Sequence, residues 1–382
     1  MRELQTRLTK FSPDAELHDC AKEILGRLNE HGSKDHQKFV NKSHSKYKKA
    51  IKEKPKTYGQ DWQAYNKAQQ KEKLALMSIL IELVNHIPVQ EKTTKGRKPF
   101  SLVDKLFFVV MQAYNQKSSR RCISDLEISK KLGYITKEPY FTSVLKTLKD
   151  PTLTSYLKYL IELSSAPLRS VETDFAVDSS GFSTSLFGRW FDIRTGKESN
   201  KRQYRKVHII CGVKTNIIAS LNITSGYSAD SPEFTQLIKD ANQIFQIKEV
   251  SADMAYSSHK NLEFVDQIGA IPFIPFKSNV VRKGLGIWGE MLRFSKGYPD
   301  EFFYHYHKRS NVETTFHMIK RKFGSFLRSR TETGQSNELL AKCLCHNLCI
   351  LVQESMELGI DIDFKNCPLD EIAHKFKGTA HK

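Results

Sequence analysis

Apolar residues in the first 166 positions recur every three or four residues, the spacing of amphipathic helices. The clearest cases are 15–28, where Leu17, Ile24 and Leu28 are in phase, and 72–86. We expect both segments to be helices with one buried face. The lysine-rich stretch 42–56 between them fits either a nucleic-acid contact arm or a plain linker.

Helix-start signals organise the segment that follows. Ser101 with Asp104 three residues later is an acidic variant of the capping box and predicts a helix over the next apolar run. A helix from Ser124 to Gly133 and another over 139–148 are then expected. Two helices joined by a short glycine-containing turn suit a helix-turn-helix, although structural bundles contain such pairs as well.

After Pro167 the pattern changes to short apolar runs separated by turns. Strands are expected at 175–177, 207–213, 217–223, 249–252 and 270–274. Helices are expected at 233–245 after an Asp-Ser-Pro cap, at 259–268 after Ser257 or Ser258, and at 307–323 and 337–358. Strands followed by alternating helices and strands are typical of an α/β fold.

These patterns divide the chain into four parts. We expect a helical basic region at 1–95, a second all-α region at 96–166, an α/β domain at 167–358 and a carboxy-terminal tail at 359–382. No apolar run approaches the ~20 residues that cross a bilayer, and the amino terminus lacks the apolar core of a secretory signal. The sequence therefore predicts a cytoplasmic protein without a membrane partner.

Charge adds a partner to this picture. The 382 residues contain 60 Lys and Arg against 42 Asp and Glu, a formal net charge of +18. Such an excess favours a polyanion such as nucleic acid, although a basic surface can also serve solubility alone. The seven cysteines are scattered, which predicts reduced thiols rather than a disulfide framework.

Two acids follow expected strands directly. Asp178 comes after 175–177 and Asp253 comes after 249–252. Ligands of open α/β sheets gather beyond the carboxyl ends of the strands, so both acids are candidates for one site. A single acid at such a place is more often a turn or cap residue. Asp174 competes with Asp178, which we prefer because small residues follow it.

The helix at 307–323 carries a third acid. A period of 3.6 residues puts Arg309, Glu313, His317 and Lys320 on one face, beside an apolar stripe. A bland interpretation is an exposed Arg309–Glu313 ion pair worth ~0.3 kcal/mol. Cations around a carboxylate also suit a phosphate backbone that lies over a metal site.

The glycines at 284, 286 and 289 match a nucleotide-binding spacing, but no strand precedes them, so a loop is expected. Cys343, Cys345, His346 and Cys349 resemble zinc ligands, but on a helix they point in different directions. We expect them to pack in the core.

Tyr306, Arg309, Glu313 and Lys320 reproduce a spacing of Tyr, two residues, Arg, three residues, Glu, six residues, Lys. In this the chain resembles the DDE transposases of insertion sequences, over roughly residues 97–352. The Tyr204–His208 segment is also similar to the second strand of these enzymes.

The resemblance implies an RNase H-like catalytic core with a mixed sheet and flanking helices, preceded by an all-α DNA-binding region. It implies that Asp178, Asp253 and Glu313 are the catalytic residues and the ligands of two Mg²⁺ ions, with Mn²⁺ as an alternative. Hard oxygen ligands suit Mg²⁺, and paired ions suit in-line displacement at phosphorus.

By the same resemblance, Tyr306, Arg309 and Lys320 contact DNA. The expected function is cleavage at transposon ends and transfer into target DNA, by a homodimer bound to double-stranded DNA. The alternatives are an RNase H-like DNA nuclease without strand transfer and a non-enzymatic helix-turn-helix regulator.

Overall fold

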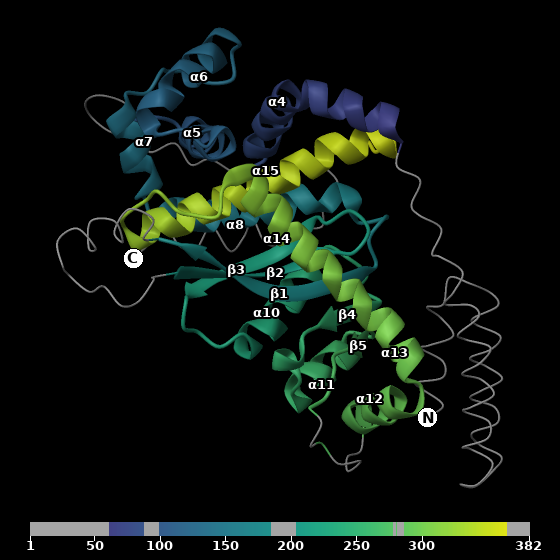
Figure 1. Cartoon of the computed structure of the whole chain (residues 1–382). Coiled ribbons are helices and arrows are strands. Elements are labelled where there is room, and N and C mark those ends of the chain that lie inside the picture. Colours follow the sequence, from purple (N-terminus) through teal and green to yellow (C-terminus); the bar gives the residue numbers. More distant parts are fainter. Residues whose placement is uncertain (1–60, 88–98, 185–203, 278–279, 281–285, 365–382) are drawn as a thin grey trace, which may run out of the picture. The chain divides into compact units, whose positions relative to one another are not determined.

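The computed structural model describes residues 61–87, 99–184, 204–277, 280 and 286–364 (Figure 1). The expected helix at 15–28 and the stretch 42–56 lie outside these residues. The described chain separates into two compact units. The larger contains 61–246 and 309–364, and the smaller contains 247–308. Each unit is described by itself.

Five helices open the larger unit. They are α4 (Trp62–Asn85), α5 (Leu102–Asn115), α6 (Ser119–Lys131), α7 (Phe141–Leu148) and α8 (Thr152–Ser165), followed by the short η1 (Ala166–Leu168). Helix α5 begins as expected, because the Ser101 side chain accepts a hydrogen bond from Asp104 N at 3.0 Å. Its apolar residues are almost all buried, and it contacts α4, α6 and α7.

The expected starts of α6 and α7 were wrong. Ser118 caps α6, and the Ser124 hydroxyl instead donates to the Arg121 carbonyl within the helix. Thr136 donates its N–H and its hydroxyl to the Asp104 carboxylate, and α7 begins later than expected, at Phe141 after Tyr140. Helix α6 thus begins earlier than expected, and α7 begins later.

Three antiparallel strands form the sheet of the larger unit in the order β3-β2-β1: β1 (Asp174–Ser183), β2 (Tyr204–Gly212) and β3 (Ile218–Ser225). Strand β1 is much longer than the expected 175–177, because it pairs with β2 through Ser183. The backbone ladder thus overrides the weak strand preference of the Ser-Ser-Gly segment. The β2–β3 turn lies where expected, with Asn216 at a positive φ of 63°.

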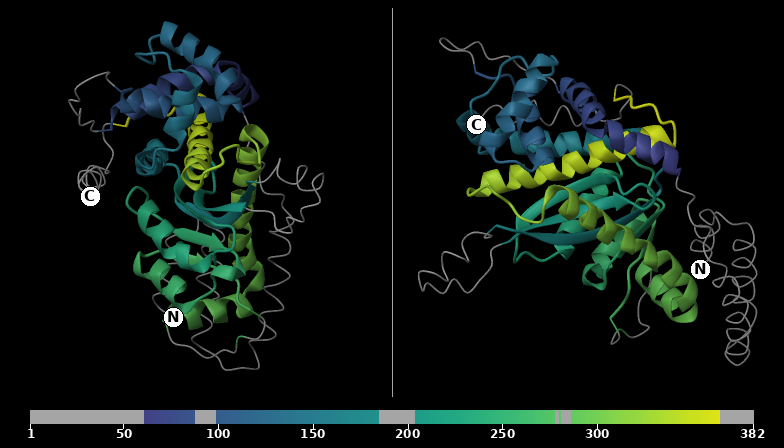
Figure 2. Two further views of the ribbon diagram at one scale, coloured as in Figure 1. Left: turned by 90° about the vertical axis from the view of Figure 1, so that its left-hand side faces the viewer. Right: turned by 45° about the horizontal axis from the view of Figure 1, so that its top comes forward.

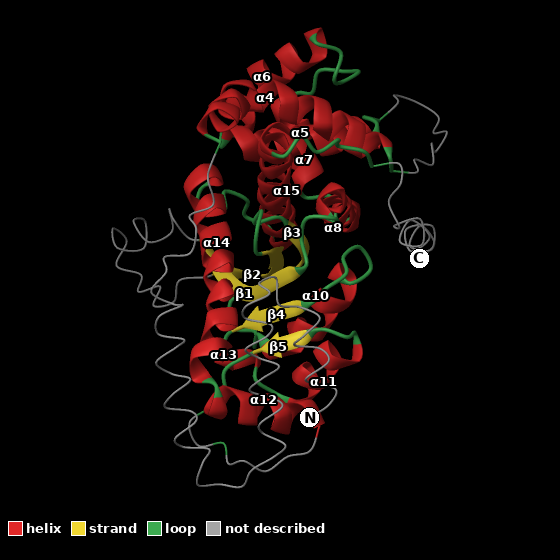
Figure 3. Ribbon diagram, turned by 90° about the vertical axis from the view of Figure 1, so that its right-hand side faces the viewer, coloured by secondary structure: helices red, strands yellow, loops and turns green. Residues whose placement is uncertain are grey.

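Helices cover both faces of this sheet. The short η2 (Ser231–Glu233) leads into α10 (Phe234–Ala241), and the opposite face carries α14 (Ser310–Phe323), which contacts β1 and β2 (Figure 3). Side chains alternate between the two faces. Phe175 packs on Phe245, which follows α10, while Cys211 approaches Thr315 of α14.

The last helix, α15 (Glu332–Glu357), packs on α4, α5 and α8 (Figure 2). It begins before the expected residue 337, because the Thr331 side chain caps it by accepting from Gly334 N. Asn347 fixes it to the sheet: its Oδ1 accepts from Ile218 N and its Nδ2 donates to the carbonyls of Ile161 and Ile218. Cys343, Cys345 and His346 are buried here, as expected.

The smaller unit contains β4 (Glu249–Ala252), η3 (Met254–Tyr256), α11 (His259–Gln267), β5 (Ile271–Phe273), α12 (Gly286–Gly297) and α13 (Pro299–Tyr306). Strands β4 and β5 are parallel. The Ser258 cap of α11 is confirmed, since its hydroxyl accepts from Asn261 N. The loop expected around the glycines was wrong for Gly286 and Gly289, because Gly286 begins α12, whose Ile287 and Trp288 are buried. Gly284 lies outside the described residues.

The described residues therefore combine parallel and antiparallel strand pairs with flanking helices, which confirms a mixed α/β architecture. The described cysteines are free thiols. None of the described helices is both long and apolar enough to cross a membrane.

Candidate active site

Asp178 lies in the middle of β1, not at its end. Alternation along the strand directs Asp178, Ser180 and Phe182 to the face that carries α14. The Asp178 side chain is 21% exposed. Its Oδ1 accepts from Ser179 N at 2.8 Å, and its Oδ2 accepts from Arg309 Nη1 at 2.8 Å. The carboxylate is thus held from two directions.

Arg309 joins Asp178 to Glu313. The other guanidinium nitrogen, Nη2, donates to Glu313 Oε1 at 2.5 Å. Arg309 is mostly buried, whereas Glu313 is 58% exposed. The expected helical ion pair is therefore present, but one cation also binds a carboxylate from the sheet. Two acids far apart in the sequence converge on one positive charge.

Lys320 lies further along the same face of α14. Its Nζ donates to Ser180 Oγ at 2.7 Å and lies 5.2 Å from the centre of the Phe182 ring. Burial lowers the pKa of the Lys320 amine. Arg309, Glu313 and Lys320 thus share one face, as the helical period predicts.

The apolar stripe holds α14 in place. Val312, Phe316, Ile319 and Phe323 are buried, which confirms the predicted stripe. Thr315, also buried, has its hydroxyl 3.2 Å from Asn216 Oδ1 in the β2–β3 turn. The sheet therefore fixes how α14 is rotated, and with it the position of Glu313.

Asp253 and Tyr306 belong to the smaller unit. Asp253 follows β4 directly, as expected, and its Oδ1 accepts from Met254 N at 2.5 Å to cap η3. Tyr306 ends α13, with its ring centroid 5.9 Å from that of Phe303. The structure brings together Asp178, Arg309, Glu313 and Lys320. That Asp253 and Tyr306 join them stays a prediction.

The carboxylates suit a divalent metal ion in their chemistry. Mg²⁺ prefers hard oxygen donors, and Asp178 and Glu313 supply them. Both carboxylates already converge on one cation, the Arg309 guanidinium. The described residues contain no group of three or more His, Cys, Asp or Glu placed to hold a metal ion. That Asp253 supplies a third donor stays a prediction from the family resemblance.

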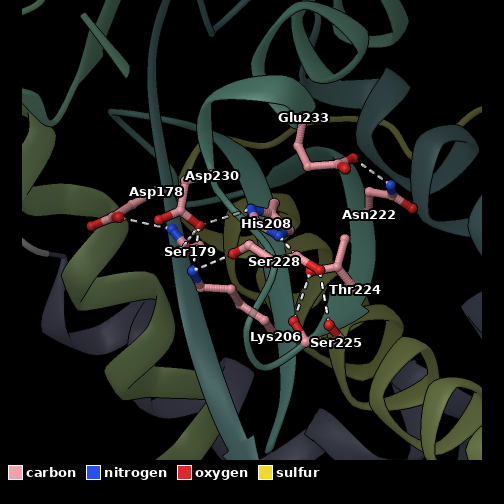
Figure 4. A network of polar contacts seen from close by, with 10 residues as sticks. All are labelled: Asp178, Ser179, Lys206, His208, Asn222, Thr224, Ser225, Ser228, Asp230 and Glu233. Carbon is pink, nitrogen blue, oxygen red and sulfur yellow. Dashed lines mark hydrogen bonds and ion pairs between the residues drawn. The ribbon is translucent and has the colours of Figure 1, made fainter. Parts of the chain in front are cut away.

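Sequence reasoning missed a polar network behind Asp178. Ser179 donates its hydroxyl to Asp230 Oδ1 at 2.8 Å, and Lys206 lies 2.6 Å from the same oxygen (Figure 4). The expected strand ended at residue 177, so Ser179 was assigned to no face of the sheet, and Asp230 was expected only as a helix cap. Its side chain makes no cap hydrogen bond in η2.

Comparisons with known proteins relate this part of the chain to a known family. Residues 169–348 match the family model of the transposase DDE domain. Over this region the chain is therefore similar to the DDE-class transposases of insertion sequences. Transposases are enzymes that act on DNA.

A particular relative is the probable transposase for insertion sequence element ISA1214 of Archaeoglobus fulgidus. It is 26% identical over 267 residues, which cover 70% of this chain and 80% of the relative. The matched family region contains Asp178, Asp253 and Glu313, the three acids chosen from the sequence.

Proposed function

We propose that the chain is a DNA transposase that cleaves the strand at transposon ends and joins the freed end to target DNA, within an RNase H-like catalytic core. One observation carries this proposal: Arg309 holds Asp178 and Glu313 together inside a transposase DDE domain. A DNA-binding regulator would not need two carboxylates gathered around one cation.

Asp178, Glu313 and Asp253 would hold two divalent ions, Mg²⁺ or Mn²⁺. Such ions, when bound, supply Lewis-acid stabilisation of the attacking and leaving oxygens at phosphorus. Ser179 N already orients Asp178 Oδ1, so a cation that binds Asp178 Oδ2 needs only to take the place of Arg309. The exposed Glu313 lies on the side open to solvent, where DNA can approach.

Arg309, Lys320 and Tyr306 would contact DNA near the scissile phosphate. Arg309 has two sets of partners in this scheme: carboxylates without DNA and phosphate oxygens with DNA. Both are charge-assisted bonds of similar kind, so the exchange costs little. Lys320 is held against Ser180 and Phe182, which presents its charge in a fixed position.

The helical region 96–166 would bind double-stranded DNA as well. Arg121 and Lys130 of α6 and Lys146 of α7 are exposed, and Arg120 lies 4.6 Å from the centre of the Phe141 ring. Neighbouring Tyr140 is 68% exposed. Cations interleaved with aromatic rings are suited to phosphate and base contacts. The expected homodimer on DNA and the cytoplasmic location belong to this proposal.

Strand transfer separates a transposase from a nuclease of the same fold. A labelled DNA fragment with the end of the element, a supercoiled target plasmid and Mg²⁺ should yield labelled end joined covalently to plasmid. Cleaved end without joined product would support the nuclease. Binding without cleavage would support the regulator.

A further inference from the structure

Asp230 lies behind β1, on the face opposite α14. Its Oδ1 accepts from Ser179 Oγ at 2.8 Å and lies 2.6 Å from Lys206 Nζ (Figure 4). His208 Nδ1 is 3.4 Å from the same oxygen, without the geometry of a hydrogen bond. Three groups therefore lie around one carboxylate oxygen: the Ser179 hydroxyl, the Lys206 ammonium group and the His208 imidazole.

Ser179 connects this carboxylate to Asp178. Its backbone N–H donates to Asp178 Oδ1 at 2.8 Å, and its hydroxyl donates to Asp230 on the other face. Successive side chains of a strand point to opposite faces, so one residue is held from both sides of the sheet. A shift of Asp230 would be transmitted to the N–H that orients Asp178.

Further contacts hold Asp230 in turn. Lys206 Nζ donates to the Ser228 carbonyl at 3.2 Å, and the wholly buried His208 has its Nε2 2.8 Å from Thr224 Oγ1. Buried or partly buried charges are weak contributors to stability, because desolvation offsets much of their attraction. An ionic network of this kind behind a functional carboxylate is better explained by orientation than by stability.

We propose that Ser179 and Asp230 are positioning residues that hold the Asp178 carboxylate in the orientation that binds a divalent cation. The inference rests on the proposed function, in which Asp178 is a metal ligand. Hydrogen-bond partners behind metal ligands typically change metal affinity by about 10- to 100-fold when removed. Neither residue touches the metal or the DNA in this account.

The chain offers a matched control three residues from Asp230. Glu233 Oε2 accepts from Asn222 Nδ2 at 2.5 Å, so it too ties the start of α10 to the sheet (Figure 4). This contact does not include Ser179. If Asp230 only connected this loop to the sheet, substitution of Glu233 should change Mn²⁺ affinity as much as substitution of Asp230 does.

The test is Mn²⁺ affinity of the full-length protein by isothermal titration calorimetry, with melting temperature measured for each variant. Ser179→Ala keeps the backbone N–H and removes only the hydroxyl, and it should weaken Mn²⁺ binding about tenfold. Ser179→Thr keeps a hydroxyl and should restore affinity. Asp230→Ala should match Ser179→Ala, while Glu233→Gln should bind Mn²⁺ like the wild type.

Normal Mn²⁺ affinity of folded Ser179→Ala, or equal losses in Asp230→Ala and Glu233→Gln, would overturn the positioning role. Asp178→Asn distinguishes this failure from failure of the proposed function. If the wild type binds Mn²⁺ and Asp178→Asn does not, the metal site stands and only the positioning role is lost. If Asp178→Asn binds Mn²⁺ as the wild type does, both the metal site at Asp178 and the positioning role are wrong.

Discussion

Arg309 is the residue on which the geometry of the site depends most. Its guanidinium supplies the positive charge that lets Asp178 and Glu313 lie close together. A metal ion bound by the same oxygens would have to displace it. In the proposed function, Arg309 and the metal would therefore compete for these carboxylates when DNA is absent.

Arg309→Ala should consequently tighten Mn²⁺ binding in the absence of DNA, although it removes a residue of the site. We expect about fivefold, because a partly exposed ion pair contributes on the order of 1 kcal/mol. Affinity for end DNA should fall at the same time. Calorimetry with Mn²⁺ and a fluorescence-anisotropy titration with DNA measure the two effects.

Lys320→Ala is the matched control, because Lys320 carries the same charge on the same helix face but binds Ser180 rather than a carboxylate. It should weaken DNA binding and leave Mn²⁺ affinity unchanged. Equal Mn²⁺ affinities of Arg309→Ala and the wild type would show that Arg309 does not compete for the carboxylates.

The sequence identified Arg309, Glu313 and Lys320 because the helical period and the signature spacing both relate residues that are close together in the chain. It could not identify Ser179 and Asp230 as partners. Their contact depends on the β1–β2 register, which pairs Ser179 with His208. Strand register is set by long-range pairing, which one sequence does not reveal.

At the scale of elements, α15 holds the larger unit together. Nearly every side chain from Asn337 to Val352 is buried, and Asn347 bonds to both α8 and β3. The sequence predicted this helix but placed its start at 337. The structural start is earlier, at Glu332, because Thr331 caps the helix there.

Helix α15 also contains a buried acid, Glu354. Burial, with the nearby charges of Glu357 and Glu172, raises its pKa to about 7. The unfolded chain releases this proton near pH 4.3, whereas the folded chain keeps it until about pH 7. The folded state therefore loses stability as the pH rises between these values.

Glu354→Gln removes this titration and should raise the free energy of unfolding at pH 8 by on the order of 2 kcal/mol, with little change at pH 4. Urea unfolding at both pH values measures the difference. The assignment would be refuted if the gain in the free energy of unfolding of Glu354→Gln over the wild type were no larger at pH 8 than at pH 4.

At the scale of the whole molecule, the sequence predicted the α/β class and all five described strands, because short apolar runs between turns differ from the helical period of 3.6 residues. Helix boundaries were less predictable. The starts of α6 and α15 depend on which serine or threonine finds a backbone partner, whereas α7 begins after Tyr140 without a side-chain cap. The domain boundaries at 95, 166 and 358 stay predictions.

The net charge of +18 leads to a prediction about the whole protein. Affinity for duplex DNA should fall steeply with salt, with a log-log slope near −0.9 for each phosphate contact. Titrations between about 50 and 200 mM salt measure it. Arg121→Ala, on the exposed face of α6, should reduce the slope by about one unit if α6 contacts phosphate. A slope near zero for the wild type would contradict electrostatic DNA binding.

The central claim is that Asp178, Asp253 and Glu313 act together in metal-dependent DNA cleavage. The most direct measurement is single-turnover cleavage of a labelled transposon end by Asp253→Asn at saturating DNA and Mg²⁺. The rate should fall by about a thousandfold or more, since loss of a metal ligand removes several kcal/mol of transition-state stabilisation. DNA affinity and melting temperature should stay close to the wild type. Cleavage at the wild-type rate would contradict the account.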